Sequence, residues 1–118
     1  MIADGGIKGS REIILALAAG ASSVMIGGLF ANTKESRGGG EYRGQASREF
    51  QMDFYGEVKE GTVPEGRAKS YDNIGARPAS DVIEELLGGI RSGMTYGGAA
   101  NISELQRKAE FMRVTGRY

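Results

Sequence analysis

The chain has 118 residues, and its 15 basic and 15 acidic side chains leave it without net charge at pH 7. This balance excludes an overall field that attracts nucleic acid or a membrane surface, and the absence of a long apolar stretch or a secretory signal predicts a cytoplasmic protein. Glycine is frequent, with 20 residues, whereas cysteine is absent, which excludes disulfides, thiolate metal sites and a cysteine nucleophile in this sequence; we expect no metal site in it.

Residues 1–31 have the pattern of two strands joined by a helix. A short apolar strand, Met1-Ile2-Ala3, runs into Asp4-Gly5-Gly6, and a second strand, Val24-Met25-Ile26, ends in Gly27-Gly28. Between them Ser10 is placed to act as the N-cap of a helix. Its apolar face comprises Ile13, Ile14, Leu17 and Ala18, before Gly20 stops it. This order predicts parallel strands connected by a crossover helix.

Residues 32–79 show weak periodicity, frequent charges and recurring glycines. A loop of this length is uncommon inside a compact domain and is usually functional or disordered. Its aromatic side chains are Tyr42, Phe50, Phe54, Tyr55 and Tyr71. They favour a structured active-site flap over a plain linker.

Residues 80–118 return to regular structure. Ser80 is a candidate N-cap for a helix that Gly88-Gly89 is expected to interrupt. Asn101 and Glu104 have the spacing of a capping box for a short helix, and Phe111 to Thr115 alternates like a last strand. The apolar helical face comprises Val82, Ile83, Leu86, Leu87 and Ile90. Three short strands are too few for a closed sheet, so the chain is expected to be a piece of a larger α/β fold.

Both glycine pairs are expected at the C-terminal ends of parallel strands, the edge where α/β folds bind ligands. Glycines there leave backbone N–H groups uncovered, which a phosphate can approach, and Asp4 is placed to accept a hydrogen bond from a sugar hydroxyl. An alternative is that the glycines only form turns and that Asp4 only caps the following helix.

Several motifs occur together in a characteristic order. They are Ala3-Asp4-Gly5-Gly6-Ile7, Val24-Met25-Ile26-Gly27-Gly28, Glu35-Ser36, Tyr42-Arg43-Gly44, Pro64-Glu65-Gly66, Gly88-Gly89-Ile90-Arg91-Ser92-Gly93-Met94-Thr95-Tyr96, Glu104-Leu105 and Arg113-Val114-Thr115-Gly116. In this order and spacing they resemble the closing part of the IMP dehydrogenase and GMP reductase family, over almost the whole chain. The resemblance implies a partial (β/α)8 TIM barrel, consisting of the last two β/α units and the flap. Its parts would be a phosphate-binding β/α/β unit in 1–31, the flap in 32–79, and in 80–118 a barrel helix, a short helix and a terminal strand.

The resemblance also implies a site for a purine mononucleotide, GMP or IMP. It assigns the ribose hydroxyls to Asp4 and the 5′-phosphate to Gly6, Gly27, Gly28 and the Tyr42 hydroxyl. It assigns the neighbourhood of the base to Gly44 and Gln45 and the purine edge to Glu65. Gly5 and Gly66 are further expected substrate-binding residues. Each assignment has an alternative when taken singly: Tyr42 as packing within the flap, for example, or Glu65 as a solvated charge.

Glu35 and the sequence of the flap bear on whether the chain resembles the reductases or the dehydrogenases of this family. Glu35-Ser36-Arg37-Gly38-Gly39 is similar to a reductase motif whose glutamate transfers a proton as the amino group leaves, although a related glutamate occurs in dehydrogenases. The Arg-Tyr dipeptide typical of dehydrogenase flaps is absent between Gly44 and Pro64, whereas residues 89–94 are closer to dehydrogenases. The favoured activity is therefore NADPH-dependent deamination of GMP to IMP. The alternative is NAD-dependent oxidation of IMP to XMP.

The family's cysteine nucleophile lies upstream of the Asp-Gly-Gly turn, so we expect this chain alone to be inactive. The missing N-terminal barrel portion or a complementing chain is the expected partner, and the complete enzyme is expected to use NADPH or NAD, to form a homotetramer and to bind a monovalent cation. Three alternatives stay open: a fragment of a longer protein, a separately encoded half, or a non-catalytic nucleotide-binding or assembly module. The start at Met1 inside an expected strand favours a split or truncated gene.

Overall fold

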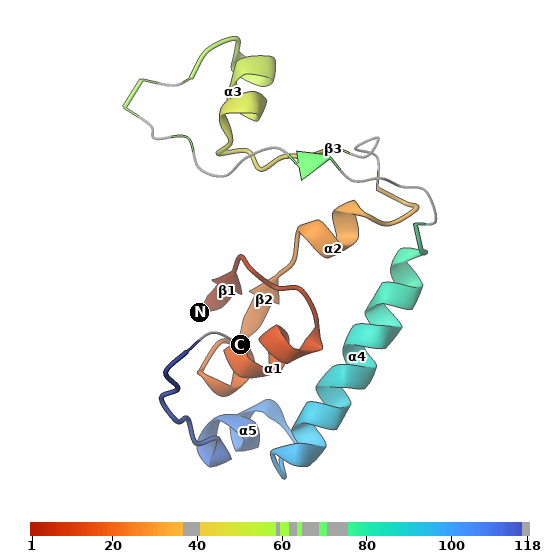
Figure 1. Ribbon diagram of the computed structural model, residues 1–118, viewed down its shortest axis with the longest axis vertical. Helices are drawn as coiled ribbons and strands as arrows, with labels where there is room; N and C mark the ends of the chain where they lie inside the picture. The colour runs from red at the N-terminus through yellow and green to blue at the C-terminus, as the bar shows by residue number, and fades with distance from the viewer. Residues whose placement is uncertain (37–40, 59, 62–63, 65–68, 71–75, 117–118) are drawn as a thin grey trace. The chain divides into compact units, whose positions relative to one another are not determined.

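The structure is a computed structural model that describes residues 1–36, 41–58, 60–61, 64, 69–70 and 76–116. It separates into two compact units (Figure 1). The first unit comprises Met1–Ile26 together with Ile83–Tyr118, and the second unit comprises Gly27–Val82. No helix in the described part of the chain combines the length and the apolar composition that crossing a bilayer requires.

The first unit contains the predicted strand, helix and strand at its N-terminus. Strand β1 (Ile2–Asp4) and strand β2 (Ser23–Met25) pair in parallel, with Ala3 opposite Val24, and helix α1 (Ser10–Ala18) connects them (Figure 1). The prediction of a parallel pair with a crossover helix is therefore confirmed. Both strands lie within one residue of their predicted positions because apolar residues and the following glycines define them locally.

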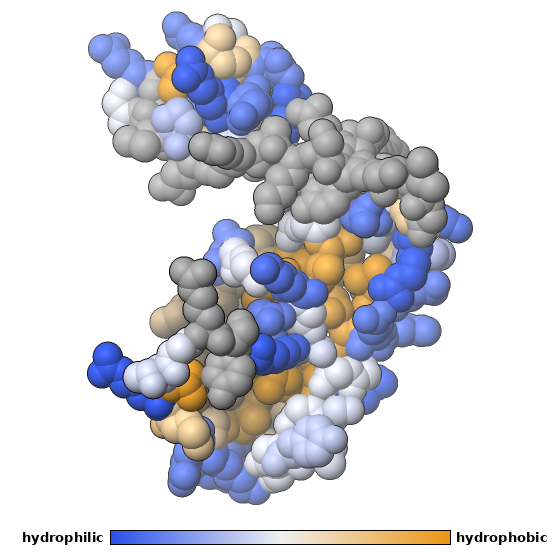
Figure 2. All heavy atoms as spheres, in the orientation of Figure 1, coloured by the Kyte–Doolittle hydropathy of each residue, from blue (hydrophilic) through white to orange (hydrophobic). Residues whose placement is uncertain are grey.

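The two faces of this small sheet differ in burial. Ala3 and Val24 are half-buried, whereas their neighbours Ile2 and Met25 are 61% and 53% exposed. Side chains alternate between the faces of a strand, so one face is partly covered and the other, which also carries Asp4, is open. In the space-filling view, hydrophobic residues reach the surface between hydrophilic stretches (Figure 2).

Helix α4 (Ala79–Tyr96) runs without a break through Gly88-Gly89, so the predicted interruption is wrong. Gly89 and Gly93 of this helix have a packing role. A Cβ on Gly89 would overlap the side chain of Ser10, and one on Gly93 would lie 2.6 Å from Ile14 Cγ1. The absence of these side chains allows α4 to approach α1 closely, and this contact offsets the low helix propensity of glycine.

The helix starts show which capping predictions were correct. Ser10 is the first residue of α1, preceded by Gly9 without a side-chain cap, and Ser80 is the second residue of α4, so neither serine is the predicted N-cap. Helix α1 begins one residue, and helix α4 two residues, before its predicted start, a shift within the usual variation of helix ends. Asn101 does cap helix α5 (Ile102–Lys108).

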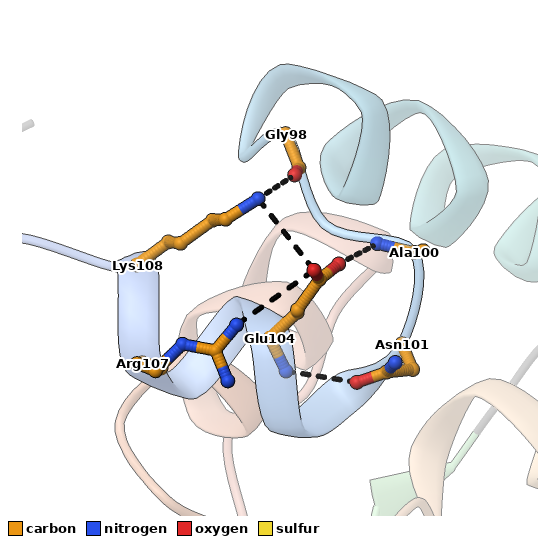
Figure 3. Close-up of polar contacts among 6 residues, drawn as sticks. All are labelled: Gly98, Ala100, Asn101, Glu104, Arg107 and Lys108. Atoms are coloured by element: carbon orange, nitrogen blue, oxygen red, sulfur yellow. Dashed lines mark hydrogen bonds and ion pairs between the residues drawn. The ribbon is translucent and has the colours of Figure 1, made fainter.

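Figure 3 shows the polar contacts that begin α5. Asn101 Oδ1 accepts the Glu104 backbone N–H at 2.9 Å, and Glu104 Oε2 accepts the Ala100 N–H at 2.7 Å. Glu104 Oε1 also lies 3.7 Å from Arg107 Nη2 and 3.8 Å from Lys108 Nζ. The capping box is confirmed, with its carboxylate reaching one residue further back than the simplest form of the motif.

The predicted last strand does not form. Residues 111–115 have no regular secondary structure, and Phe111 and Met112 are 62% and 84% exposed. A strand requires a neighbour that accepts and donates its backbone hydrogen bonds, and no other strand of the described part of the chain pairs with this segment. The alternation of residues 111–115 alone therefore did not make them a strand.

The second unit contains a short helix α2 (Gly28–Ala31), a helix α3 (Arg48–Tyr55) and an antiparallel pair, β3 (Glu41–Tyr42) with β4 (Lys69–Ser70). Helix α3 begins because Ser47, which is fully buried, accepts the Phe50 N–H at 3.2 Å. It ends at Gly56, whose φ of 77° suits a residue without a Cβ. The segment expected to form a flap thus includes a capped helix.

Candidate functional site

The first glycine pair forms a turn directly after β1. Gly5 and Gly6 have φ angles of 90° and 74°, a left-handed conformation that side chains with a Cβ rarely adopt. Asp4 is the last residue of β1 and is exposed, opposite Met25 of β2. The glycines are therefore required by the backbone, and the carboxylate of Asp4 is accessible at the end of the strand.

The second glycine pair begins α2 and meets Tyr42. The carbonyl of Gly27 accepts the N–H groups of Phe30 and Ala31 at 3.1 and 2.9 Å, which starts the helix. A Cβ on Gly27 would overlap the Tyr42 hydroxyl and lie 2.8 Å from Tyr42 Cζ. Glycine at this position therefore allows the tyrosine of β3 to reach the backbone at the beginning of α2.

A cavity of about 550 Å³ lies within the second unit. It is lined by Gly27, Phe30, Ala31, Thr33, Glu35, Ser36, Tyr42, Arg43, Phe50 and Ala79. Three of the residues predicted to act on a nucleotide, Gly27, Glu35 and Tyr42, are thereby brought to one cavity. Its lining combines one carboxylate and one guanidinium with three hydroxyl groups and with apolar side chains, a composition that suits a small polar ligand with an aromatic part.

Glu35 is held in this lining by a turn and by a helix start. Thr33 and Arg77 form a parallel bridge, and the Lys34 N–H donates to the Arg77 carbonyl at 3.1 Å. Glu35 Oε2 accepts the N–H of Ala79, the first residue of α4, at 2.8 Å. One carboxylate oxygen therefore satisfies a backbone donor at the start of an 18-residue helix, where negative charge is favourable.

Arg43 is a charged residue of the cavity lining to which the sequence analysis assigned no role. Its guanidinium forms an ion pair with Asp53 and lies over the Phe50 ring, 5.9 Å from the centroid. The available signal was its position between Tyr42 and Gly44, in a motif already connected with phosphate. A positive charge beside a predicted phosphate contact was a reason to include it.

The remaining predicted residues lie elsewhere. Gly44 and Gln45 precede α3 in a turn, in which the Gly44 carbonyl accepts the Ser47 N–H at 3.0 Å, and they are not part of the cavity lining. Gly28 is the first residue of α2 and does not line the cavity either. Glu65 and Gly66 lie outside the described residues.

The arrangement in the second unit can bind an anion and hold a carboxylate near it. Tyr42 offers a hydroxyl, and Arg43 offers a positive charge. Glu35 is a candidate for proton transfer with a ligand in the same cavity. Within the described residues, no three histidine, cysteine or acidic side chains form a group that could hold a metal ion.

Comparison with known families gives one match over nearly the whole chain. A family model described as the IMP dehydrogenase / GMP reductase domain matches residues 1–117. Among curated proteins, inosine-5′-monophosphate dehydrogenase of Aquifex aeolicus is 45% identical over 130 residues, and that of Streptococcus pyogenes is 44% identical over 133 residues. Each comparison covers 98% of this chain, which spans about a quarter of the length of these relatives, 26% and 27%.

Solved structures give the same result. The structure is similar to a GMP reductase of Trypanosoma brucei in complex with guanosine 5′-monophosphate, with a TM-score of 0.77, 34% identity, and coverage of 98% of this chain and 25% of the reductase chain. It is also similar to an inosine 5′-monophosphate dehydrogenase of Legionella pneumophila, with a TM-score of 0.64, 42% identity, and coverage of 97% and 38%.

Proposed function

Since the chain belongs to the IMP dehydrogenase / GMP reductase domain family, we propose that it forms the C-terminal part of a (β/α)8 barrel that binds a purine 5′-monophosphate. The observation that carries this proposal is the contact of the Tyr42 hydroxyl with the Gly27 backbone, in the cavity that also contains Glu35 and Arg43. Two residues assigned to one phosphate by resemblance are adjacent in space although 15 positions separate them in the sequence.

The phosphate is assigned to backbone and hydroxyl donors. Gly27 and Gly28 offer main-chain N–H groups at the start of α2, where the Tyr42 hydroxyl lies against Gly27, and Gly5 and Gly6 form a glycine turn after β1. Backbone donors suit a phosphate because they are fixed by the fold before the ligand arrives. These donors would anchor the nucleotide and orient its base.

Other residues would recognise the nucleoside. Asp4 is assigned to the ribose hydroxyls, because the two oxygens of a carboxylate can accept hydrogen bonds from two hydroxyl groups. Its exposure at the end of β1 fits that role. Gly44 and Gln45 are assigned to the neighbourhood of the base, and Glu65 with Gly66 to the purine edge.

The favoured reaction is reduction of GMP to IMP with loss of ammonia. The chain is shorter than the matching region of the dehydrogenases, since alignments over 130 and 133 residues exceed its 118 residues, and this fits a shorter flap. The flap also lacks the Arg-Tyr dipeptide of dehydrogenases. The TM-score with the reductase, 0.77, is higher than that with the dehydrogenase, 0.64, despite the lower identity.

Glu35 would supply the proton chemistry. Its Oε2 atom is oriented by the Ala79 N–H, and we assign proton transfer to the Oε1 atom. In the reductase reaction, NADPH when bound would supply the hydride that takes the place of the C2 amino group, and the amino group would take up protons and leave as ammonium. Glu35 would move one of these protons at the nitrogen.

The cavity of the second unit is assigned to the mononucleotide, with its phosphate and its base. NADPH, or NAD in the dehydrogenase alternative, is assigned to the completed barrel, which would also supply the cysteine nucleophile that this sequence lacks. The completed barrel is where a homotetramer and a monovalent-cation site would arise.

The test is isothermal titration of GMP and IMP into the full chain, alone and with a matching N-terminal barrel portion, together with an assay of cofactor turnover. We expect binding of the monophosphates after complementation, and oxidation of NADPH in the presence of GMP. Binding without turnover by any nicotinamide cofactor, or no binding in either state, would instead favour a non-catalytic module.

Inosine-5′-monophosphate dehydrogenase is the second candidate because the curated relatives at 44% and 45% identity have that name. In the same assay it would reduce NAD in the presence of IMP and leave NADPH unchanged with GMP. That result would reject the reductase while retaining the purine-nucleotide site.

A further inference from the structure

The placement of Tyr42 requires support from outside its own strand. Strand β3 has two residues and pairs with the two residues of β4, so few backbone hydrogen bonds hold it. The Tyr42 hydroxyl nevertheless has to stay against Gly27 if both are to contact one phosphate. Short isolated strand pairs are only marginally stable, so a contact beyond the strand pair helps to hold the tyrosine in place.

Arg43, the next residue, provides that contact with α3. Its guanidinium forms an ion pair with Asp53 and lies over the ring of Phe50. Asp53 and Phe50 are three residues apart on α3, so they lie on the same side of the helix. Arg43 is thus held at two points of one helix turn, and its backbone continues directly into Tyr42.

Helix α3 is itself well fixed at its N-terminus. The buried Ser47 caps its N-terminus, the Ser47 N–H donates to the Gly44 carbonyl, and Gln51 Nε2 donates to the Ala46 carbonyl at 3.4 Å. Stacking of Phe50 on Phe54, with ring centroids 5.4 Å apart, adds to its rigidity. A rigid helix of this kind can hold Arg43 in one position.

We propose that Asp53 is a positioning residue that acts through Arg43 on Tyr42 and so increases the affinity of the site for the phosphate group of its nucleotide. This inference rests on the proposed function, because the phosphate is assigned to Tyr42 and Gly27. Asp53 itself is 64% exposed in its side chain and is not part of the cavity lining. Its effect is therefore indirect and specific to the phosphate end of the ligand.

The test compares a nucleotide with its nucleoside. Dissociation constants for GMP and guanosine are measured with the complemented chain, for the unmodified protein and for Asp53→Asn, Asp53→Glu and Tyr42→Phe. The ratio of guanosine to GMP dissociation constants isolates the contribution of the phosphate. An exposed ion pair contributes little, so we expect Asp53→Asn to reduce this ratio about five-fold, whereas Asp53→Glu keeps the charge and most of the ratio.

Glu57→Gln is the matched control, since it removes one negative charge from an exposed residue just after α3 ends at Gly56. It should leave both dissociation constants unchanged. Hydrogen exchange of the free protein gives a second readout: in Asp53→Asn the amides of Tyr42 and Arg43 should exchange faster while those of residues 51–55 keep their protection.

Five results would overturn the inference. Equal weakening of GMP and guanosine would assign Asp53 a general structural role, and loss of protection within α3 would assign the effect to the helix. A rise in GMP affinity in Asp53→Asn would mean that Asp53 competes with the phosphate for Arg43. An unchanged ratio in Asp53→Asn together with a reduced ratio in Tyr42→Phe would reject the role of Asp53 but keep the proposed phosphate site. Unchanged ratios in both variants would reject the role of Asp53 and the proposed phosphate site.

Discussion

Single carboxylates at helix starts have two different expected roles in this chain. Glu35 accepts the Ala79 N–H at 2.8 Å, and Glu104 accepts the Ala100 N–H at 2.7 Å. The N–H of Ala79 is a donor that helix α4 leaves unpaired, whereas Ala100 precedes the cap residue of α5; at both helix starts the negative charge is favourable. Glu104 serves the helix alone, whereas Glu35 also lines the cavity and combines the structural bond with its proposed proton transfer.

Glu104→Ala tests the structural value of such a contact. The substitution removes the bond to Ala100 and the proximity to Arg107 and Lys108, so we expect it to lower the free energy of unfolding by about 1 kcal/mol. Urea unfolding followed by circular dichroism measures this change. Glu110→Ala, at an exposed carboxylate beyond α5, is the control and should have little effect; equal losses in the two variants would contradict a specific cap.

Neighbouring glycines of one helix can have opposite roles. Gly88 is exposed and an added Cβ there has no atom within 4 Å, whereas Gly89 lies against Ser10 and Gly93 against Ile14. The first glycine only weakens the helix, while the other two permit the close packing of α4 on α1. Buried apolar residues of the same unit, Ile13, Leu17, Leu86 and Leu105, form the core around this contact.

Alanine at positions 88 and 89 separates these roles. Gly88→Ala should raise the free energy of unfolding by about 0.5 to 1 kcal/mol because alanine favours the helix. Gly89→Ala should instead lower it by about 1 to 3 kcal/mol because the new methyl group overlaps Ser10. Urea denaturation of both variants is the measurement. Stabilisation by both would show that α1 and α4 are not in close contact.

At the scale of the whole molecule, the open face of the β1 and β2 pair is the feature that requires explanation. Ile2 and Met25 are exposed there, and two parallel strands alone are not a stable sheet in water. In the proposed barrel this face would be turned toward the interior, and upstream strands would complete the sheet.

Met25→Lys tests this completion. A charge on the open face should reduce self-association of the isolated chain and weaken assembly with the N-terminal barrel portion, since removing the lysine ammonium from water costs free energy even though Asp4 lies opposite it. Sedimentation velocity of the chain alone and of the mixture checks both expectations. Met52→Lys is the matched control, because Met52 on α3 is 46% exposed, close to the 53% of Met25, and lies outside the sheet. Assembly that Met25→Lys does not weaken would argue against a buried face.

The features determined by the sequence itself are local. The strand, helix and strand of the first 31 residues, the glycines with positive φ after β1 and the capping box of α5 depend on neighbouring residues, and the pattern of apolar and turn residues predicted them. The family was identified from motifs in order, a signal that also needs no coordinates. The predicted break of α4 and the predicted strand at 111–115 were wrong because neighbours in space, or their absence, decided them.

Tertiary structure alone decided which distant residues meet. Glu35 bonds to Ala79 across 44 positions, and Arg43 joins Asp53 across ten, with no periodic pattern to indicate either pair. The close approach of Gly89 to Ser10 likewise follows from the packing of two helices. Local patterns specify backbone conformation, whereas contacts across the chain depend on how the elements bury their surfaces together, and that packing brings Gly27, Glu35 and Tyr42 to one cavity.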